Sequence, residues 1–529
     1  MKNDILLKKI KFEKGKIFFE SNNSWSFCLN AFKSENNKIY YLLDNEINRK
    51  KIKEINENII IVNKFFDSKN EKKKLRDYQK EDVEKLSKLK SVAIFSEMRT
   101  GKTPIALSIF KKWKKKKMLI IVPGILQNHW QISVEEWLEE PAYLISDLNP
   151  KLRFFFYKKI FLEKKNLIII VSKDIFKIDS NNELFKKQIK TNKDICVIID
   201  EAHFLRNHLS QQSKSIYKLK NIEYKIALTG TPIVNNHTDI FGILKFINKK
   251  KYSSYWKFVK EYFEINEIKF LKEKKNYKFI QIKDFKNEEK KNELKKELKE
   301  FSVNRKQKDV LSWIPPIIYE KKYLLMEKKQ EKKYEKIKKI WKDKYQTLKL
   351  LTKLKTLTLY PPLLKVKELG IKIKFIVDFI EEEKNNNSLI IFSTRSNTFL
   401  EPLSEILKNK NILIDKIFGK ITRKQKEENI KKFQEGKIKI LLCNIKSSGF
   451  GINLSKAETI IFADRSYSPS DNEQAEARFL PVNEKESKKI LLIIDLICKN
   501  TIDEKIITLL EKKKNITKII NNEPDYFFT

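Results

Sequence analysis

The sequence predicts an α/β protein in which two parallel-sheet lobes flank a cleft, with a helical connector and a small N-terminal accessory region. Two observations support this prediction. Strand-like apolar runs alternate with helical stretches in two separate series along the chain, which is typical of βαβ units and parallel sheets. Between the two series lies a stretch rich in Lys and Glu with helical spacing and few turn signals, which favours solvated helices. Two lobes joined in this way enclose a cleft, where ligands commonly bind.

The expected domain boundaries follow these changes of pattern. In chain order we expect a strand-rich accessory region over residues 1–70, a first lobe over 71–250, a helical connector and brace over 251–365, a second lobe over 366–515 and a tail over 516–529. In the accessory region, short apolar segments at 16–20 and 59–66 are separated by Asn and Ser turns. The strands expected in the first lobe are residues 92–95, 118–122, 167–171, 195–199 and 225–228. Those expected in the second lobe are residues 388–392, 439–443, 459–462 and 490–494.

Length and composition restrict the class of protein. A chain of 529 residues corresponds to two to four domains at ~100–200 residues each. The apolar share of 41% excludes a wholly disordered protein, and no apolar run approaches the ~20 residues that span a bilayer. The N-terminus carries scattered charges and lacks the apolar core of a signal peptide. The four Cys lie far apart without metal-type pairing, which indicates a reducing compartment. We therefore expect an intracellular protein with no membrane partner.

The charge balance is strongly basic. The chain has 112 Lys and Arg against 69 Asp and Glu, a net charge of +43, for which nucleic acid is the natural partner. Only ten of the basic residues are Arg, however, and Ile and Asn are abundant, as in AT-rich genomes that favour Lys codons. Both explanations stay open, so the charge alone does not identify the function.

A phosphate-binding loop is indicated at residues 96–103, which read SEMRTGKT. The segment follows a predicted strand and opens a predicted helix, the context in which backbone N–H groups bind phosphates. It ends in Gly101, Lys102 and Thr103, although Ser96 stands where the usual first glycine would be. Lys102 is expected to reach the β- and γ-phosphates of a nucleotide, and Thr103 to place its hydroxyl on Mg²⁺. The alternative is a chance loop in a Lys-rich chain, which the strand–loop–helix context disfavours.

An acidic pair follows another strand of the first lobe. Asp200 and Glu201 open the sequence DEAH directly after the apolar run 196–199. Acidic groups at the C-terminal end of a strand lie at the mouth of an α/β sheet, where ligands bind. We expect Asp200 to hold Mg²⁺ and Glu201 to orient and deprotonate an attacking water. The alternative, a surface acidic turn, is disfavoured because a phosphate-binding loop lies in the same lobe.

With these two motifs, the sequence resembles the helicase superfamily 2 ATPases and, within them, the SNF2-type translocases. The narrower resemblance rests on further segments in the family's order: LRDYQ at 75–79, IVP at 121–123, ALTGTPIVNN at 227–236, NRK at 304–306, PPLL at 361–364, IIFS at 390–393, SGFGINL at 448–454 and QAEAR at 474–478. The loop residues MRT at 98–100 and RFLP at 478–481 are similar to SNF2-like helicases of phages and small genomes. The resemblance implies two RecA-like lobes flanking a nucleotide cleft, and a virus or phage is one source that it allows.

The resemblance also implies roles for individual residues. Gln79 is the expected adenine contact, and ATP with Mg²⁺ is the expected cofactor. The catalytic residues implied are Lys102, Asp200, Glu201 and Arg478, with Thr103 and Asp200 as metal ligands. The nucleotide is further expected to contact Arg99, Thr100, Gly101, Lys102 and Thr103 from the first lobe, and Gly451 and Arg478 from the second. Thr229, Gly230 and Thr231 are expected to couple the nucleotide state to DNA.

DNA is the expected macromolecular partner, bound through its backbone without sequence readout. The contacts implied by the resemblance are Pro123, Ser172, Ser393, Thr394, Arg395, Lys446 and Ser447. For each Ser or Thr taken alone, an ordinary turn or helix N-cap is the alternative reading.

One departure from the family pattern bears on hydrolysis. The family's last motif has Arg four and seven positions after Gln, whereas Gln474 is followed by Arg478 and then by Pro481. The second of those arginines acts on the γ-phosphate, and arginines of this kind contribute ~10³–10⁵ in rate. Either Arg478 or Arg465 substitutes for it, or hydrolysis is slow or absent.

These observations predict a DNA-dependent ATPase of SNF2 type that translocates on duplex or branched DNA, in the cytoplasm or on the nucleoid. Two alternatives stay open. One is a nucleotide-gated DNA-binding protein with weak or no hydrolysis, which Pro481 motivates. The other is an RNA helicase, which the segment at 227–236 disfavours. The sequence predicts no particular protein partner.

Overall fold

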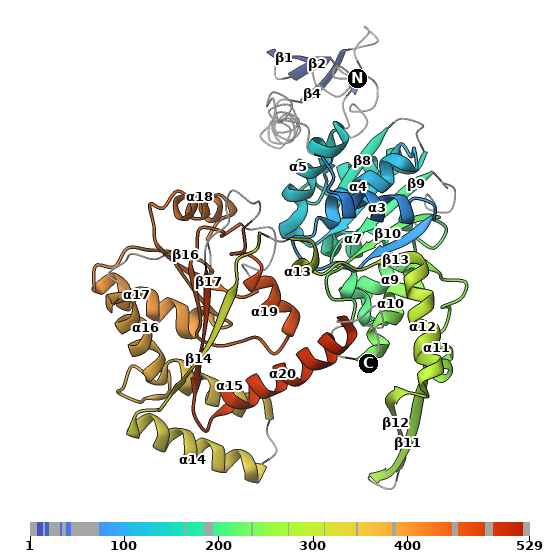
Figure 1. The fold of residues 1–529 in the computed structure, drawn as a ribbon. Coiled ribbons are helices and arrows are strands. Elements are labelled where there is room, and N and C mark those ends of the chain that lie inside the picture. The colour runs from blue at the N-terminus through green and yellow to red at the C-terminus, as the bar shows by residue number, and fades with distance from the viewer. Residues whose placement is uncertain are drawn as a thin grey trace. The chain divides into compact units, whose positions relative to one another are not determined.

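The computed structural model describes short strands in the N-terminal region and most of the chain from residue 74 to residue 521. The described residues are 8–13, 16–20, 32–33, 39–43 and 74–521, without 163–165, 184, 186–193, 234–235, 273–274, 312, 345–346, 383–387, 420, 447–452 and 482–489. By its contacts the chain divides into two compact units, which are described separately below (Figure 1). Unit 1 comprises Met1–Glu97 and Gly101–Arg305, and unit 2 comprises Met98–Thr100 and Lys306–Thr529.

The N-terminal strands form a small antiparallel sheet. Its order is β1 (Lys8–Glu13), β2 (Lys16–Glu20), β4 (Ile39–Leu43) and β3 (Phe32–Lys33). The strand expected at 16–20 is therefore β2, whereas the run expected at 59–66 lies outside the described residues.

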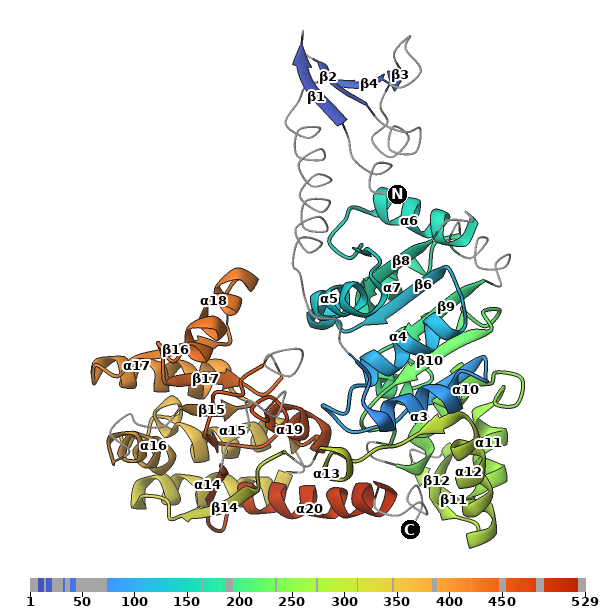
Figure 2. The same ribbon diagram turned by 45° about the horizontal axis from the view of Figure 1, so that its top comes forward.

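Unit 1 is built on a parallel sheet. Within the described residues its order is β13 (Ser302–Val303), β5 (Ser91–Ile94), β10 (Tyr224–Leu228), β9 (Ile195–Ile199), β6 (Lys117–Val122), β8 (Leu167–Ser172) and β7 (Ala142–Leu144), and every neighbouring pair is parallel. Strands β6 and β9 are buried at every position, as expected of central parallel strands covered on both faces. Figure 2 shows β8, β6, β9 and β10 side by side with helix α4 (Lys102–Lys112) against them. The sequence prediction of a parallel α/β lobe is confirmed.

The other helices of unit 1 connect these strands. They are α3 (Asp77–Leu86), α5 (Gln127–Leu138), α6 (Pro150–Leu162), α7 (Lys173–Asp179), α9 (Gln211–Tyr217), α10 (Phe241–Ile247), α11 (Tyr255–Tyr262) and α12 (Glu288–Phe301). Several begin at a side-chain cap, in which a Ser or Asn oxygen accepts from a backbone N–H three residues on: Ser172, Ser210, Ser254 and Asn287. Among the described helices of the whole chain, none combines the length and apolarity needed to cross a membrane.

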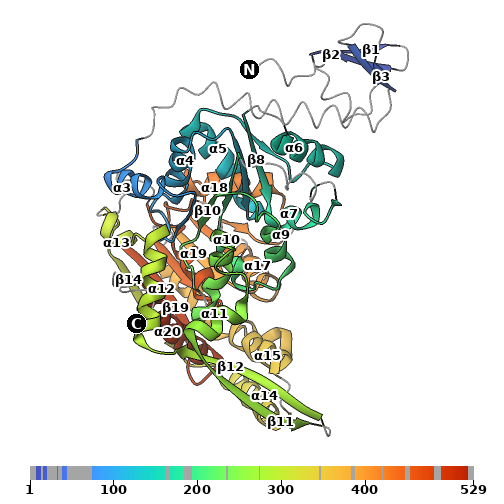
Figure 3. The same ribbon diagram turned by 90° about the vertical axis from the view of Figure 1, so that its right-hand side faces the viewer.

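A β-hairpin stands where the sequence analysis expected mostly solvated helix. Strands β11 (Phe263–Lys272) and β12 (Lys275–Phe285) pair antiparallel and leave α11 and α12 as a long ribbon (Figure 3). The helical prediction is wrong here because the apolar residues pair across strands, with Ile268 opposite Phe279 and Phe270 opposite Tyr277. The expected connector, residues 251–365, is divided between the two units. Its residues up to Arg305 belong to unit 1, where β13 pairs with β5, and its residues from Lys306 on belong to unit 2.

Unit 2 contains a second parallel sheet. Over the described part of the chain its order is β14 (Ile317–Leu324), β19 (Leu491–Cys498), β18 (Thr459–Phe462), β15 (Leu389–Ser393), β17 (Ile440–Asn444) and β16 (Ile414–Ile417). The helices are α13 (Gln307–Val310), α14 (Lys328–Lys344), α15 (Thr347–Leu359), α16 (Ile371–Glu382), α17 (Glu401–Asn409), α18 (Arg423–Gln434), α19 (Pro469–Glu476) and α20 (Ile502–Asn521). The second predicted lobe is thus also α/β and parallel, and strands β14 and β16 were not predicted.

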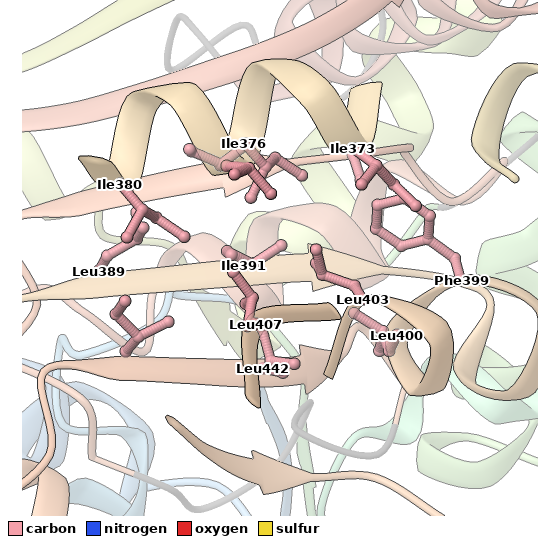
Figure 4. Close-up of a cluster of buried hydrophobic side chains, with 14 of the residues drawn as sticks. Ile373, Ile376, Ile380, Leu389, Ile391, Phe399, Leu400, Leu403, Leu407 and Leu442 are labelled. Carbon is pink, nitrogen blue, oxygen red and sulfur yellow. The ribbon is translucent and has the colours of Figure 1, made fainter. Parts of the chain in front are cut away.

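A cluster of buried aliphatic side chains holds helices against this sheet. Ile373, Ile376 and Ile380 recur at helical spacing on α16 and face Leu389 and Ile391 of β15 (Figure 4). Burying a Leu or Ile side chain contributes about 1.5–3 kcal/mol. The cluster therefore fixes β15, the strand whose C-terminal end leads into the candidate DNA-binding residues.

Candidate functional site

The phosphate-binding loop connects β5 to α4. Gly101 is the N-cap of α4 and has a φ of +82°, a left-handed conformation that glycine adopts without strain. The Lys102 ammonium turns back over the loop and donates to the carbonyl oxygens of Ser96 at 3.0 Å and Glu97 at 3.1 Å. The backbone N–H groups of Lys102 and Thr103 at the start of α4 and the Lys102 charge together suit a phosphate group.

The expected adenine contact lies against this loop. Gln79 is on α3, is almost fully buried, and accepts a hydrogen bond from the Arg76 N–H at 2.9 Å. A Cβ atom built on Gly101 would be 2.1 Å from Nε2 of Gln79. A larger residue at this position would therefore push the Gln79 amide aside. Arg99 and Thr100 complete the loop, with Arg99 at a φ of +64° and Thr100 buried.

The acidic pair lies directly after β9. Asp200 is buried, and its Oδ2 accepts from the Trp130 indole N–H at 2.8 Å while its Oδ1 accepts from the Glu201 N–H at 2.8 Å. Burial, and to a smaller extent the neighbouring Glu201, raise the pKa of Asp200 to about 6. The Trp130 hydrogen bond and the Lys102 charge oppose that rise. Glu201 itself adopts a φ of +53°, which is uncommon outside glycine.

Contacts continue from the acidic pair to the expected coupling residues. Nδ1 of His203 lies 3.2 Å from Oε2 of Glu201 and 3.2 Å from Oγ1 of Thr229. That hydroxyl oxygen also accepts from the Thr231 N–H at 3.1 Å. Thr229 and Thr231 were expected coupling residues, whereas no role was predicted for His203. Its place at the end of the DEAH motif could have indicated that it lies beside the acidic pair.

Gly230 lies beside the phosphate-binding loop. A Cβ atom on Gly230 would be 3.6 Å from the Ser96 carbonyl oxygen and 3.7 Å from the Lys102 ammonium nitrogen. The acidic pair, the expected coupling residues and Lys102 are therefore neighbours in unit 1.

The donors expected for Mg²⁺ suit that ion. Asp200 offers a carboxylate, and Thr103 offers a hydroxyl as the second residue of α4. Among the described residues there is no group of three or more His, Cys, Asp or Glu arranged to hold a metal. Mg²⁺ does not need such a cage, because it commonly takes one or two protein oxygens together with substrate phosphates and waters.

The expected DNA contacts of unit 1 lie at the ends of two neighbouring strands. Pro123 follows β6 and Ser172 ends β8, and a Cβ on Gly124 would be 3.8 Å from Cβ of Ser172. The Ser172 hydroxyl accepts from the Ile175 N–H at 3.2 Å and caps α7. The N-cap that the sequence analysis gave as the alternative for a single Ser is therefore what this hydroxyl does.

The expected DNA contacts of unit 2 surround a buried carboxylate. Asp464 accepts from the Ser393 hydroxyl at 2.5 Å, from the Thr394 N–H at 3.0 Å and from the Thr394 hydroxyl. The Arg395 N–H donates to the Ser393 hydroxyl at 3.1 Å. The exposed Lys446 lies after β17, and its N–H bonds to Asn444. Ser447 and Gly451 fall outside the described residues.

Of the two candidates for the missing arginine, one is already engaged. Arg465 is buried, donates to Asp495 through Nε at 2.5 Å and Nη2 at 3.0 Å, and also bonds to Glu476. Arg465 is therefore a structural ion-pair partner, which leaves Arg478 or slow hydrolysis as the remaining alternatives. Arg478 follows α19 and is half-buried, and Pro481 nearby is buried.

Comparisons with known proteins identify the family of the chain. The model of the SNF2-related domain matches residues 35–368, and that of the helicase conserved C-terminal domain matches residues 371–480. The chain is 26% identical over 482 residues to an uncharacterized ATP-dependent helicase of Mycoplasma genitalium, covering 86% of this chain and 43% of that protein. It is 27% identical over 511 residues to an uncharacterized ATP-dependent helicase of Mycoplasma pneumoniae, covering 90% and 45%.

The chain thus spans less than half the length of these two relatives. Among solved structures, the Sulfolobus solfataricus SWI2/SNF2 ATPase core in complex with dsDNA is 23% identical with a TM-score of 0.38, covering 86% of this chain and 94% of that one. Because the SNF2-related model spans more than half of the sequence and the helicase C-terminal model follows it, the chain belongs to the SNF2-related domain family.

Proposed function

We propose that this chain is a DNA-dependent ATPase that translocates on duplex or branched DNA and remodels or reanneals it. The observation that carries the proposal is the position of Gly230 beside Lys102 in unit 1, next to Thr229, which contacts His203 and through it Glu201. A phosphate site and a base for water lie at the two ends of this set of residues. The arrangement suits hydrolysis of a nucleoside triphosphate. The residues between the two ends, Thr229, Gly230 and His203, would respond to whether the triphosphate is bound.

In the proposed reaction Gln79 contacts adenine, and the N–H groups at the start of α4 hold the phosphates. The Lys102 ammonium exchanges its bonds to the loop carbonyls for bonds to the β- and γ-phosphates. Bound Mg²⁺, held by Thr103 and Asp200, would neutralise charge on those phosphates. Glu201 orients the attacking water and accepts its proton.

The coupling step uses the contact between Glu201 and His203. When Glu201 turns to water, its hold on the His203 ring weakens, and the ring is free to strengthen its bond to Thr229. Thr229 in turn fixes the backbone of Thr231. The nucleotide state would thereby reach the segment after β10, which the family resemblance assigns to coupling.

Unit 2 is proposed to contribute Arg478 and Gly451 to the nucleotide and part of the DNA contact. Since Arg465 is committed to Asp495 and Glu476, Arg478 alone is proposed to act on the γ-phosphate. DNA is proposed to bind through its phosphates at Pro123, Ser172, Arg395, Lys446 and Ser447, with a salt-sensitive contribution from the many Lys. The hydroxyls of Ser393 and Thr394 donate to Asp464 and are proposed to hold the backbone of this site in place.

The proposal is tested by phosphate release in the presence of single-stranded, duplex or forked DNA or RNA. Duplex or forked DNA should stimulate hydrolysis, and Lys102→Ala should abolish it. Lys111→Ala is the matched control, because Lys111 is exposed on the same helix. No stimulation by any DNA would favour the nucleotide-gated binding protein that Pro481 motivates. Preferential stimulation by RNA would favour an RNA helicase.

A further inference from the structure

Arg305 is the last residue of unit 1, and its backbone is bonded to the start of the phosphate-binding loop. Its N–H donates to Oγ of Ser96 at 3.1 Å, and its carbonyl oxygen accepts from the Glu97 N–H at 2.9 Å. The usual first glycine of the loop could not accept the first of these bonds, because it has no hydroxyl. Ser96 is fully buried, so this polar contact is shielded from water.

The side chain of Arg305 is also bound, by a bidentate ion pair with Asp82. Its Nη2 donates to Oδ1 of Asp82 at 2.8 Å, and its Nε lies 3.1 Å and 3.3 Å from the two carboxylate oxygens. Asp82 is only 2% exposed. Burial raises the pKa of Asp82, and the Arg305 guanidinium opposes that rise. Lys85, one turn further along α3, is separately bonded to the carbonyl oxygens of Lys299 and Ser302.

Asp82 lies one turn after Gln79 on α3, and Gln79 is packed against Gly101. Arg305 therefore joins the helix that carries the expected adenine contact to the first residues of the phosphate-binding loop. The next residue, Lys306, belongs to unit 2. The chain leaves unit 1 at a residue that is fixed to both sides of the candidate nucleotide site.

We propose that Arg305 is a positioning residue that sets the nucleotide site and passes its state to the segment leading into unit 2. The inference rests on the proposed function of the site. Lys102 is bonded to the same two carbonyl-bearing residues, Ser96 and Glu97, that bond to the Arg305 backbone. When phosphate draws Lys102 away, those residues are free to shift, and Arg305 moves with them. The coupling is reciprocal, so restraint of Arg305 also favours one state of the loop.

The test compares two Arg–Asp ion pairs of unit 1 whose Asp residues are buried. Arg305→Gln should raise the KM for ATP and lower the factor by which DNA stimulates hydrolysis, each roughly tenfold. Arg305→Lys should lie in between, because Lys keeps the charge but not the two-pronged geometry. Arg153→Gln is the matched control, since Arg153 makes a bidentate pair at 2.8 Å and 2.7 Å with Asp179, which is as buried as Asp82. It should lower the melting temperature without changing either kinetic quantity.

Equilibrium binding of a fluorescent ATP analogue gives a second readout that does not depend on turnover. Arg305→Gln should weaken this binding while Arg153→Gln leaves it unchanged. Wild-type nucleotide affinity in Arg305→Gln, or equal losses in both variants at the same residual stability, would overturn the inference. If the wild type binds the analogue but shows no DNA-stimulated hydrolysis, the proposed function fails, and the binding comparison still decides the role of Arg305.

Discussion

The indole N–H of Trp130 donates a hydrogen bond of 2.8 Å to Oδ2 of Asp200, and both side chains are buried. This neutral donor orients the carboxylate without cancelling its charge. Oδ1 is at the same time oriented by the Glu201 N–H. Asp200 is thus held in one orientation while burial keeps its pKa near 6, and its negative charge stays available for a cation.

Replacing Trp130 by Phe removes a donor that favours the charged form of Asp200. The pKa of Asp200 should then rise further, by up to about one unit. In the pH profile of kcat/KM, the acid limb should move to higher pH, so activity falls at pH 6.5 and recovers by pH 9. Trp113→Phe is the control, because the Trp113 indole donates at 3.0 Å to the Ser87 carbonyl, a bond outside the candidate site. An unmoved acid limb in Trp130→Phe would contradict the prediction.

The raised pKa of Asp200 also predicts that the protein without nucleotide and metal is destabilised in a pH-dependent way. The pKa is higher in the folded protein than in the unfolded chain, so the stabilising contribution of the protonated form is complete below about pH 4 and is lost as pH rises through about 6. A displacement from 3.8 to about 6 corresponds to about 3 kcal/mol. Ionised Asp200 therefore destabilises the ligand-free protein at pH 8.

Asp200→Asn should remove most of this cost. The Asn side chain cannot ionise, but its NH₂ group would face one of the two donors, which forfeits a hydrogen bond of about 1 kcal/mol. We expect the variant to be more stable than the wild type by about 1–2 kcal/mol at pH 8 and to lose that advantage towards pH 4. Urea unfolding in EDTA across this range measures the difference. A variant that is less stable than the wild type at pH 8 would show that the ionised carboxylate is not a net cost.

Gly101 predicts a separable effect on nucleotide affinity. Ala at Gly101 or at Gly436 must adopt a positive φ, at +82° and +75°, which costs roughly 1–2 kcal/mol. Of the two, only Gly101 would bring the new Cβ close to another group, since Nε2 of Gln79 lies 2.1 Å away, whereas the nearest atom at Gly436 is Cε of Lys456 at 3.9 Å. Both variants should therefore lose similar stability in thermal unfolding. Gly101→Ala alone should displace Gln79 and raise the KM for ATP. The expected increase is roughly fivefold or more, because one hydrogen bond to adenine would be lost. Similar KM values in the two variants would refute the role of Gln79.

The sequence predicted the central strands well because burial on both faces leaves a continuous apolar run, as in β6 and β9. It missed β14, in which Ile, Tyr, Lys and Glu residues alternate between half-buried and exposed positions within a Lys-rich stretch. The partner of β14 is β19, which lies far away in the sequence, so no local pattern marks the pairing. The short strands β7 and β13 were missed for the same reason.

The candidate site was predictable where spacing along the chain carries the chemistry. Asp200 follows β9 directly and Lys102 follows the loop after β5, and their neighbourhood in unit 1 follows from the parallel sheet. The partners of individual side chains were not predictable. The engagement of Arg465 with Asp495 depends on two neighbouring strands coming together in space, and so does the use of the Ser393 hydroxyl by Asp464.

Asp464 organises the residues that follow β15 in unit 2. It pairs with the Lys355 ammonium at 2.6 Å and accepts three further hydrogen bonds from Ser393 and Thr394. Burial works to raise the pKa of Asp464, but Lys355 and the hydroxyl donors outweigh it, so the pKa lies below its ordinary value. The carboxylate therefore stays ionised and keeps the turn that presents Arg395 in one conformation.

Asp464→Asn should weaken this turn and with it the response to DNA. The Lys355 ammonium would be left buried without its charge partner, and breaking a buried pair in this way costs about 3–5 kcal/mol. Asp503→Asn is the control, because Asp503 pairs with the equally buried Lys372 at 2.6 Å and its carboxylate accepts from the Thr358 hydroxyl and the Cys498 N–H instead of from Ser393 and Thr394. Both variants should unfold at lower temperature, whereas only Asp464→Asn should raise the DNA concentration for half-maximal ATPase stimulation several-fold, with unchanged ATP affinity. Equal shifts in both variants would assign the effect to lost stability and remove Asp464 from the DNA site.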